Sequence, residues 1–245
     1  MKKSRIYGLI GKNIDYSFSK KFFSEKFEKE NLSCIYSNFD IENISHLKSI
    51  LQDNTINGFN VTIPYKEEIL KFLDEIDEAA KTIGAVNTIK KINNKYIGFN
   101  TDFIGFEKSL IGLIENKKPE NALILGSGGA SKAVKYVLNK LNINYSTVSR
   151  KSGKSEFIYE NLNNEIINSF KLIINCSPVG TYPNINDSPN IPYEYLTEDH
   201  ILYDLIYNPA ETLFLKKGRT SGCKIKNGLE MLEVQANEAW RIWNS

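Results

Sequence analysis

The chain has 245 residues, of which 41% are hydrophobic and 24% are charged, and its formal net charge is +2 at pH 7. This composition is ordinary for one large or two modest globular domains, and the small net charge gives no case for a nucleic-acid partner. No apolar run approaches the length of a membrane span. The three cysteines lack metal-site spacing, so we expect a cytoplasmic protein without a metal.

The first sixty residues predict alternating strands and helices. Apolar runs predict three strands, at residues 5–10, 36–39 and 58–64. Four phenylalanines at helical spacing in residues 18–27 predict an amphipathic helix, with Ser17 and Ser19 at its entrance. These two hydroxyls are either helix caps or contacts to a polar ligand, and spacing alone favours the cap.

Lys66 has an unusual predicted position. Pro64 is expected to end the third strand and to begin a helix over residues 65–73, because proline suits the first helical turn. Lys66 would then lie at a helix N-terminus, where the dipole favours anions over cations. This mismatch points to a functional role, although one misplaced surface lysine is common.

A two-residue hairpin is expected at the asparagine pair 93–94, because asparagine tolerates the left-handed backbone of such a turn. Closing the hairpin there places Asn87 opposite Asn100, and Asp102 follows two residues later. We therefore expect these three polar groups to gather at one end of the hairpin. The alternative is that Asn87 and Asp102 only cap neighbouring elements.

A glycine loop follows an apolar strand predicted at residues 122–125 and precedes an amphipathic helix; it consists of Gly126, Ser127, Gly128, Gly129 and Ala130. Strand, glycine turn and helix are the context of a dinucleotide-binding loop, in which the helix N-terminus faces the pyrophosphate. Ser131 replaces the third glycine of the usual fingerprint. Taken alone the motif is weak, since a glycine-rich turn before a helix is often only a turn.

The next strand, expected at residues 145–148, ends in Ser149-Arg150-Lys151. An NAD-selective site places a carboxylate there to hold the ribose 2′-hydroxyl, whereas cations suit the 2′-phosphate of NADP. The sequence therefore favours NADP over NAD, and the alternative is a solvated basic loop.

The last third of the chain predicts strands at residues 170–175, 201–205 and 224–226, and short and long helices at 212–217 and from 229. Together with the preceding elements they give a doubly wound α/β fold. Gln235 occupies a mostly apolar face of the final helix. It is either a buried, hydrogen-bonded core residue or a ligand contact.

A nicotinamide enzyme that reduces a carbonyl needs a group to protonate the oxygen. Neither His46 nor His200 lies near the polar clusters, and the Tyr-x-x-x-Lys pairs at 16–20 and 136–140 do not follow the nucleotide fold as that pair should. Lys66 with Asp102 remains. A nearby carboxylate keeps a lysine protonated, which makes it a ready proton donor.

The chain resembles the shikimate dehydrogenase family over almost its whole length. Six motifs occur in the family's order: Asn-Val-Thr-Ile-Pro-Tyr-Lys at 60–66, Ala-Val-Asn-Thr at 85–88, Asn-Thr-Asp at 100–102, Gly-Ser-Gly-Gly-Ala at 126–130, Ile-Asn-Cys-Ser-Pro-Val-Gly at 174–180 and Met-Leu-Glu-Val-Gln-Ala at 231–236. The family reduces 3-dehydroshikimate to shikimate with NADPH, in the chorismate pathway to aromatic amino acids.

The resemblance implies a role for each matching residue. Lys66 and Asp102 would be catalytic. Substrate contacts would be Ser17, Ser19, Thr62, Lys66, Asn87, Asp102, Tyr207 and Gln235. Cofactor contacts would be Gly126, Ser127, Gly128, Gly129, Ala130, Ser149, Arg150, Lys151, Leu205 and Gly228.

The resemblance also implies two α/β domains with a cleft between them. Residues 1–101, completed by a helix at 229–245, would bind the substrate, and residues 102–228 would form a Rossmann-type NADP-binding domain. We expect a monomer or homodimer with a small-molecule substrate and no membrane partner.

Two motifs depart from the family pattern: Tyr16 and Lys20 replace its His and Pro, and Ser149-Arg150-Lys151 replaces its Asn-Arg-Thr. A quinate/shikimate dehydrogenase paralogue and a non-catalytic NADP-binding regulator therefore remain as alternatives.

Overall fold

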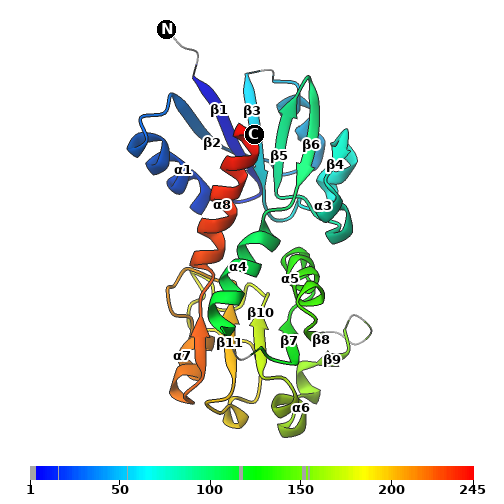
Figure 1. Ribbon diagram of the computed structural model, residues 1–245, viewed down its shortest axis with the longest axis vertical. Coiled ribbons are helices and arrows are strands. Elements are labelled where there is room, and N and C mark those ends of the chain that lie inside the picture. Colours follow the sequence, from blue (N-terminus) through cyan, green and yellow to red (C-terminus); the bar gives the residue numbers. More distant parts are fainter. Residues whose placement is uncertain (1–3, 16, 54, 116–117, 151–152, 154) are drawn as a thin grey trace. The chain divides into compact units, whose positions relative to one another are not determined.

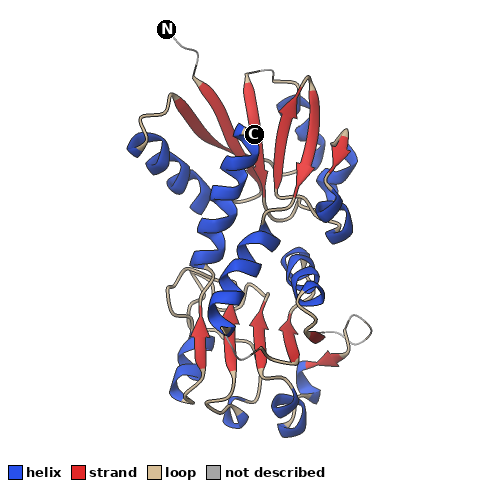
Figure 2. Cartoon of the chain, in the orientation of Figure 1, coloured by secondary structure: helices blue, strands red, loops and turns tan. Residues whose placement is uncertain are grey.

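The computed structural model describes residues 4–15, 17–53, 55–115, 118–150, 153 and 155–245. The chain divides into two compact units, each built on one β-sheet with helices packed against it (Figures 1 and 2). Unit 1 comprises Met1–Ile104 and Leu232–Ser245, and unit 2 comprises Gly105–Met231. The divisions fall after residues 104 and 231, compared with 101 and 228 expected from the sequence.

Unit 1 has a six-stranded mixed sheet in the order β2-β1-β3-β5-β6-β4. Its strands are β1 (Arg5–Gly11), β2 (Cys34–Asp40), β3 (Ile56–Val61), β4 (Glu75–Ile76), β5 (Thr88–Ile92) and β6 (Lys95–Phe99). Strand β1 runs parallel to β2 and β3, whereas β5 runs antiparallel to β3 and β6. The strands predicted from apolar runs are confirmed, and the short β4 has no sequence signal of its own.

Helices pack on both faces of this sheet; those wholly in unit 1 are α1 (Phe18–Lys29), η1 (Ile44–His46), α2 (Leu47–Leu51), η2 (Glu68–Phe72) and α3 (Glu78–Ile83). Successive side chains of a strand point to opposite faces, so β1 contributes to two cores. Leu9 packs with Phe23 of α1, whereas Ile10 packs with Leu47 and Ile69. The predicted phenylalanine helix is confirmed, with Phe23 and Phe27 buried.

The hairpin between β5 and β6 has the predicted register. Ile92 pairs with Lys95, and the two turn residues Asn93 and Asn94 have positive φ angles of 49° and 63°. This left-handed pair forms the tight turn expected from the sequence. The Asn87 N–H donates to the Phe99 carbonyl at 3.0 Å, so Asn87 continues the ladder toward Asn100.

The prediction of a helix over residues 65–73 is wrong. A turn follows β3, and only residues 68–72 form a helix, the short 3₁₀ helix η2. The Lys66 carbonyl accepts a hydrogen bond from the Val86 N–H at 2.8 Å, and the Tyr65 hydroxyl donates to the Ile41 carbonyl at 2.6 Å. These tertiary bonds take the place of a regular helical ladder. Lys66 therefore lies in a turn and not at a helix N-terminus.

Unit 2 has a six-stranded sheet in the order β12-β11-β10-β7-β8-β9, in which every pair of neighbours is parallel. Its strands are β7 (Asn121–Leu125), β8 (Asn144–Ser149), β9 (Phe157–Ile158), β10 (Leu172–Asn175), β11 (Ile201–Asp204) and β12 (Lys224–Lys226). The chain runs outward from β7 on one side and returns to β10 on the other. The predicted doubly wound fold is therefore confirmed, and its switch point lies between β7 and β10.

Helices cover both faces of the second sheet; the remaining ones are α4 (Asp102–Ile114), α5 (Gly129–Lys140), η3 (Tyr159–Asn161), α6 (Asn164–Ser169), η4 (Tyr193–Tyr195), α7 (Leu213–Thr220) and α8 (Leu229–Asn244). The Phe106 ring of α4 lies 5.1 Å from Tyr203, whereas Phe214 of α7 packs in the core with Leu202. The sequence predicted no helix or strand between residues 155 and 169, where the structure has β9, η3 and α6. Among the described residues, none of the helices combines the length and the apolar character of a bilayer span.

Helix α8, from Leu232 onward, completes unit 1. In Figure 1 it lies across β1 and β3. The Trp243 ring stacks on Tyr7 with centroids 4.6 Å apart, and its indole N–H donates to the Ile89 carbonyl at 3.0 Å. Gly58 makes this approach possible, because a Cβ at that position would lie 2.5 Å from Trp243 Nε1.

Truncating this anchor is expected to destabilise unit 1. Trp243→Ala removes a 7% exposed ring and an indole hydrogen bond, and we expect a loss of about 3–5 kcal/mol in the free energy of unfolding by urea. Ile35→Ala, at a 51% exposed position of the same unit, serves as the control and should change stability by less than about 0.5 kcal/mol. Equal losses for the two variants would contradict the anchoring role.

Candidate functional site

A lysine–carboxylate pair lies in unit 1. Lys66 Nζ donates to Asp102 Oδ2 at 2.7 Å, and the two side chains are 17% and 10% exposed. Asp102 is the first residue of α4, where the helix dipole stabilises a negative charge. The ammonium group retains enough exposure to donate to a ligand oxygen, and the carboxylate holds it in place. The structure thus joins two residues that lie 36 positions apart in the chain.

Asn87 supports the other carboxylate oxygen. Its Nδ2 donates to Asp102 Oδ1 at 2.9 Å, while its Oδ1 accepts from the Thr101 N–H at 2.7 Å. Gln235 Oε1 accepts from Asn87 Nδ2 at 3.3 Å and from Thr101 Oγ1 at 3.2 Å. The turn after β3, the start of β5, the start of α4 and the middle of α8 therefore meet in one polar cluster.

Asn100 takes a different role from Asn87. Its Nδ2 donates to the Ala85 carbonyl at 2.9 Å, and its Oδ1 accepts from the Phe103 N–H at 3.3 Å. It caps the start of α4 and ties the neighbouring loop. Of the three groups expected to gather, Asn87 and Asp102 are in direct contact and Asn100 supports the backbone beside them.

Ser17 and Ser19 lie at the start of α1. Ser17 Oγ accepts from the Lys20 N–H at 3.3 Å and is the N-cap favoured by the sequence, and it donates to Asn38 Oδ1 at 3.1 Å. Ser19 hydrogen-bonds the Tyr36 hydroxyl, and burial raises the pKa of Tyr36 while the Ser19 bond opposes that rise. Tyr16, beside this entrance, lies outside the described residues.

Thr62 follows β3 and is half-buried. Its N–H donates to the Ile10 carbonyl at 2.9 Å, and its carbonyl accepts from the Tyr65 N–H at 2.9 Å. These bonds fix the turn that carries Lys66. Tyr207 lies in unit 2, where burial raises the pKa of its hydroxyl.

The glycine loop lies at the switch point of unit 2. Gly126 has a φ of +107°, and a Cβ there would lie 3.2 Å from the Ser177 backbone nitrogen. Around Gly128 a Cβ would meet nothing within 4 Å, so space is open directly before the N-terminus of α5. Gly129 and Ala130 form the first turn of that helix. Ser131, which replaces the third glycine of the usual fingerprint, is buried. Its hydroxyl donates to the Gly128 carbonyl at 2.7 Å, so the serine side chain is accommodated within the first helical turn.

The segment that begins at the end of β8 contains Arg150, the cation predicted to bind the 2′-phosphate of NADP. Ser149 is buried, and its Oγ accepts from Ser155 Oγ at 2.8 Å. Arg150 is exposed beside Tyr159; burial raises the pKa of Tyr159 to about 12, and the positive charge of Arg150 opposes that rise. Lys151 lies outside the described residues.

Leu205 and Gly228 are in direct backbone contact. The Leu205 N–H donates to the Asn175 carbonyl at 3.1 Å, and a Cβ on Gly228 would lie 2.1 Å from the Leu205 carbonyl oxygen. Only glycine fits there without a backbone shift. The two predicted cofactor contacts therefore form one local structure at the carboxyl end of β11.

Sequence reasoning missed Asp204, a fully buried carboxylate at the end of β11. It accepts hydrogen bonds from Asn175 Nδ2 at 3.0 Å, Thr212 Oγ1 at 2.6 Å and the Ile206 N–H at 3.1 Å. Burial raises the pKa of Asp204 to about 6, although these hydrogen bonds oppose the rise. An aspartate at the carboxyl end of a buried parallel strand was the signal available in the sequence.

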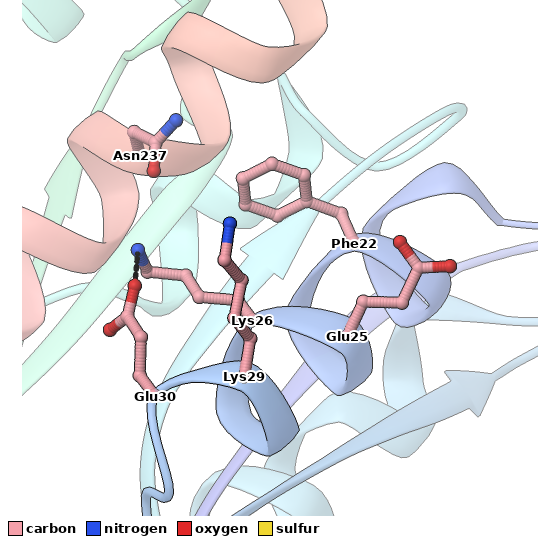
Figure 3. A pocket seen from close by; sticks show the side chains of 6 residues that line it. All are labelled: Phe22, Glu25, Lys26, Lys29, Glu30 and Asn237. Carbon is pink, nitrogen blue, oxygen red and sulfur yellow. Dashed lines mark hydrogen bonds and ion pairs between the residues drawn. The ribbon is translucent and has the colours of Figure 1, made fainter.

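Other polar features lie outside these two sites. His200 is buried and hydrogen-bonds the Thr197 N–H and the Ile167 carbonyl through its two ring nitrogens, whereas His46 is exposed. Figure 3 shows a surface pocket between α1 and α8, lined by charged side chains such as the paired Lys26 and Glu30 together with Phe22. Within the part of the chain that the structure describes, no group of His, Cys, Asp and Glu side chains is arranged to hold a metal ion.

A doubly wound parallel sheet with a glycine loop at its switch point, joined to a unit that carries a lysine–carboxylate pair, defines the class of dinucleotide-dependent dehydrogenases. Residues 9–89 match the family model described as "Shikimate dehydrogenase substrate binding domain". A relative from Methanococcus aeolicus, named shikimate dehydrogenase (NADP(+)), is 40% identical over 258 residues, which cover 98% of this chain and 92% of the relative. The chain belongs to the shikimate dehydrogenase family.

Solved structures agree with this assignment. Shikimate 5-dehydrogenase from Thermus thermophilus, in complex with NADP(H) and shikimate, has a TM-score of 0.85 at 29% identity, and the match covers 97% of this chain and 92% of that one. Quinate dehydrogenase from Corynebacterium glutamicum, in complex with NAD, has a TM-score of 0.86 at 26% identity, and the match covers 98% and 93%.

Ionisation of Asp204 is expected to lower stability. Its folded pKa of about 6 exceeds the ordinary 3.8, so its contribution is fully favourable below the unfolded pKa and is lost as pH rises through the folded one. Asp204→Asn keeps an acceptor without the charge. We expect the free energy of unfolding of the unsubstituted protein to fall by about 2 kcal/mol relative to this variant between about pH 4.5 and about pH 7.5. Parallel curves of unfolding free energy against pH would show that burial does not perturb Asp204.

Proposed function

We propose that this protein is an NADP-dependent shikimate dehydrogenase, which reduces 3-dehydroshikimate to shikimate with NADPH and catalyses the reverse reaction. The contact between Lys66 and Asp102 carries the proposal, because it places a proton donor and its partner in one largely buried site. The names of the relatives, and the shikimate and NADP(H) bound in the Thermus thermophilus structure, support this substrate and cofactor.

In the proposed mechanism Lys66 and Asp102 share the work on the substrate. NADPH, when bound, supplies the hydride that reaches the carbonyl carbon. Lys66 gives a proton from Nζ to the carbonyl oxygen, which becomes the new hydroxyl, and then takes a proton back from solvent. Asp102 accepts from Lys66 through Oδ2 and so holds the donor in position. In the reverse direction Lys66 first releases a proton to solvent and then accepts the proton of the substrate hydroxyl.

The proposed substrate contacts in unit 1 are Ser17, Ser19, Thr62, Lys66, Asn87, Asp102 and Gln235. Tyr207, which lies in unit 2, stays a prediction from the family resemblance. Serine, threonine and amide groups suit the hydroxyls of a polyhydroxylated acid. The description of the family model as a substrate binding domain supports this role for residues 9–89. Residues 1–101 with 229–245 are thus the proposed substrate-binding domain, and residues 102–228 the proposed NADP-binding domain.

The residues of unit 2 fit a dinucleotide. The open space at Gly128 and the N-terminus of α5 suit the pyrophosphate. Ser127, Gly129 and Ala130 complete the loop, and Gly126, Leu205 and Gly228 shape the neighbouring backbone. Arg150, with Ser149 and Lys151 beside it, is the proposed partner of the 2′-phosphate, since a guanidinium pairs with phosphate in bidentate fashion.

A quinate dehydrogenase is the second candidate, favoured by the structural similarity to the enzyme from Corynebacterium glutamicum. Quinate and NAD in place of shikimate and NADP would be its best pair. A non-catalytic NADP-binding regulator is less well supported, because binding alone does not require the ion pair of Lys66 and Asp102. We propose a cytoplasmic enzyme, a monomer or homodimer, that acts on a small molecule.

The proposal predicts NADP⁺ reduction when shikimate is added to the purified protein. Lys66→Met removes the proton donor and should lower kcat by about 10²–10⁴-fold, measured from the absorbance of NADPH. Lys71→Met, a substitution at an exposed lysine in the same unit, is the control and should keep normal turnover. Faster turnover with quinate and NAD⁺ would select the second candidate, and NADPH binding without turnover of either substrate would select the regulator.

A further inference from the structure

A chain of buried hydrogen bonds leads from Tyr36 to the catalytic carboxylate. The Tyr36 hydroxyl donates to Asn60 Oδ1 at 2.8 Å, and Asn60 Nδ2 donates to Thr88 Oγ1 at 3.2 Å. Thr88 Oγ1 lies 3.1 Å from Asn87 Oδ1, and Asn87 Nδ2 donates to Asp102 Oδ1. Tyr36, Asn60 and Thr88 are 4%, 5% and 0% exposed, so water does not compete for these bonds.

The direction of the chain follows from the donors at its ends. Asn60 Nδ2 can only donate, so Thr88 Oγ1 accepts from it and keeps its own hydrogen for another partner. That partner is Asn87 Oδ1 at 3.1 Å, since the alternative, Thr101 Oγ1, is farther at 3.4 Å. Asn60 Nδ2 also donates to the Asn87 carbonyl at 3.2 Å, which fixes its own orientation.

Asn87 Oδ1 accepts from the Thr88 hydroxyl and the Thr101 N–H, and the Thr101 hydroxyl lies 3.2 Å from it as a further donor. With the oxygen held, the Asn87 amide turns its Nδ2 toward Asp102. A flipped amide would place an oxygen against the carboxylate and an NH₂ group against these donors. Within the described residues, no buried side-chain nitrogen or oxygen lacks a hydrogen-bond partner, so this network is complete before any ligand binds.

We propose that Thr88 is a positioning residue for the reaction: its hydroxyl fixes the Asn87 amide, which in turn orients Asp102 and the proposed substrate contact of Asn87. This inference rests on the proposed function. Among the hydrogen bonds of the described residues, Thr88 makes none to Lys66 or Asp102, so it acts on them through Asn87, its nearer hydroxyl partner. Its neighbour Asn60 sets the direction of the Thr88 hydroxyl and forms the next step of the same chain.

The test separates the hydroxyl from the rest of the side chain. Thr88→Val replaces the hydroxyl by a methyl of similar size, Thr88→Ser keeps the hydroxyl, and Thr88→Ala removes it without adding a methyl. For Thr88→Val and for Thr88→Ala we expect kcat/KM for shikimate to fall about tenfold, with a higher KM for shikimate. The KM for NADP⁺ should stay within about twofold, because the glycine loop lies in unit 2. Thr88→Ser should restore kcat/KM for shikimate to within about threefold of the unsubstituted protein.

A merely structural role predicts a different pattern. Partial unfolding lowers kcat and leaves both KM values unchanged, and it would lower activity in step with the midpoint of urea unfolding. Normal shikimate kinetics in both Thr88→Val and Thr88→Ala, or equal losses in Thr88→Ser and Thr88→Ala, would overturn the proposal. If Thr88→Val does not fold, the comparison of Thr88→Ala with Thr88→Ser decides the outcome. If the unsubstituted protein turns over no shikimate, the proposed function fails, whereas an active protein with unaffected variants refutes only the role of Thr88.

Discussion

The polar site of unit 1 depends on one ion pair, Lys66 with Asp102, which is largely shielded from bulk water. Two largely buried charges are destabilising unless each finds a partner and further hydrogen bonds. Lys66 and Asp102 meet at 2.7 Å, Asn87 donates to the second carboxylate oxygen, and the N-terminus of α4 adds its dipole. The sheet order serves this arrangement, because the antiparallel pairs β3–β5 and β5–β6 bring the end of β3, the start of β5 and the end of β6 together.

The same physical logic governs unit 2, where the constraint is space and not charge. Parallel strands place their carboxyl ends at one edge, and the chain departs in opposite directions from β7 and β10. Gly126 has a positive φ and lies close to the Ser177 backbone, and a side chain at position 228 would collide with the Leu205 backbone. Asp204 ties the loops after β10 and β11 to the start of α7. The loops that surround the proposed dinucleotide site are therefore fixed by backbone packing and one buried carboxylate.

Local rules predicted a large part of this from the sequence. The asparagine turn fixed the register of the β5–β6 hairpin, and that register alone predicted the proximity of Asn87 and Asp102. The rule that proline begins a helix failed after Pro64, because the Lys66 carbonyl bonds Val86, which lies 20 positions further along the chain. The contact of Lys66 with Asp102 rested on elimination and family resemblance, since no periodicity links residues that far apart. Tyr36, Asn60 and Thr88 escaped notice because polar residues in strands give no sign of whether they face a core or water. Gln235 stood out as a polar residue on an apolar helix face, and its contact with Asn87 needed the fold.

We propose that Lys66 and Asp102 act as one unit on the substrate. A double-mutant cycle on kcat/KM for shikimate, with Lys66→Met, Asp102→Asn and both together, tests this claim most directly. Groups that act as a unit are strongly non-additive, so the double variant should be about as slow as the worse single variant. Losses that multiply, so that the double variant shows the product of the two single effects, would mean that the two groups act independently and would contradict the claim.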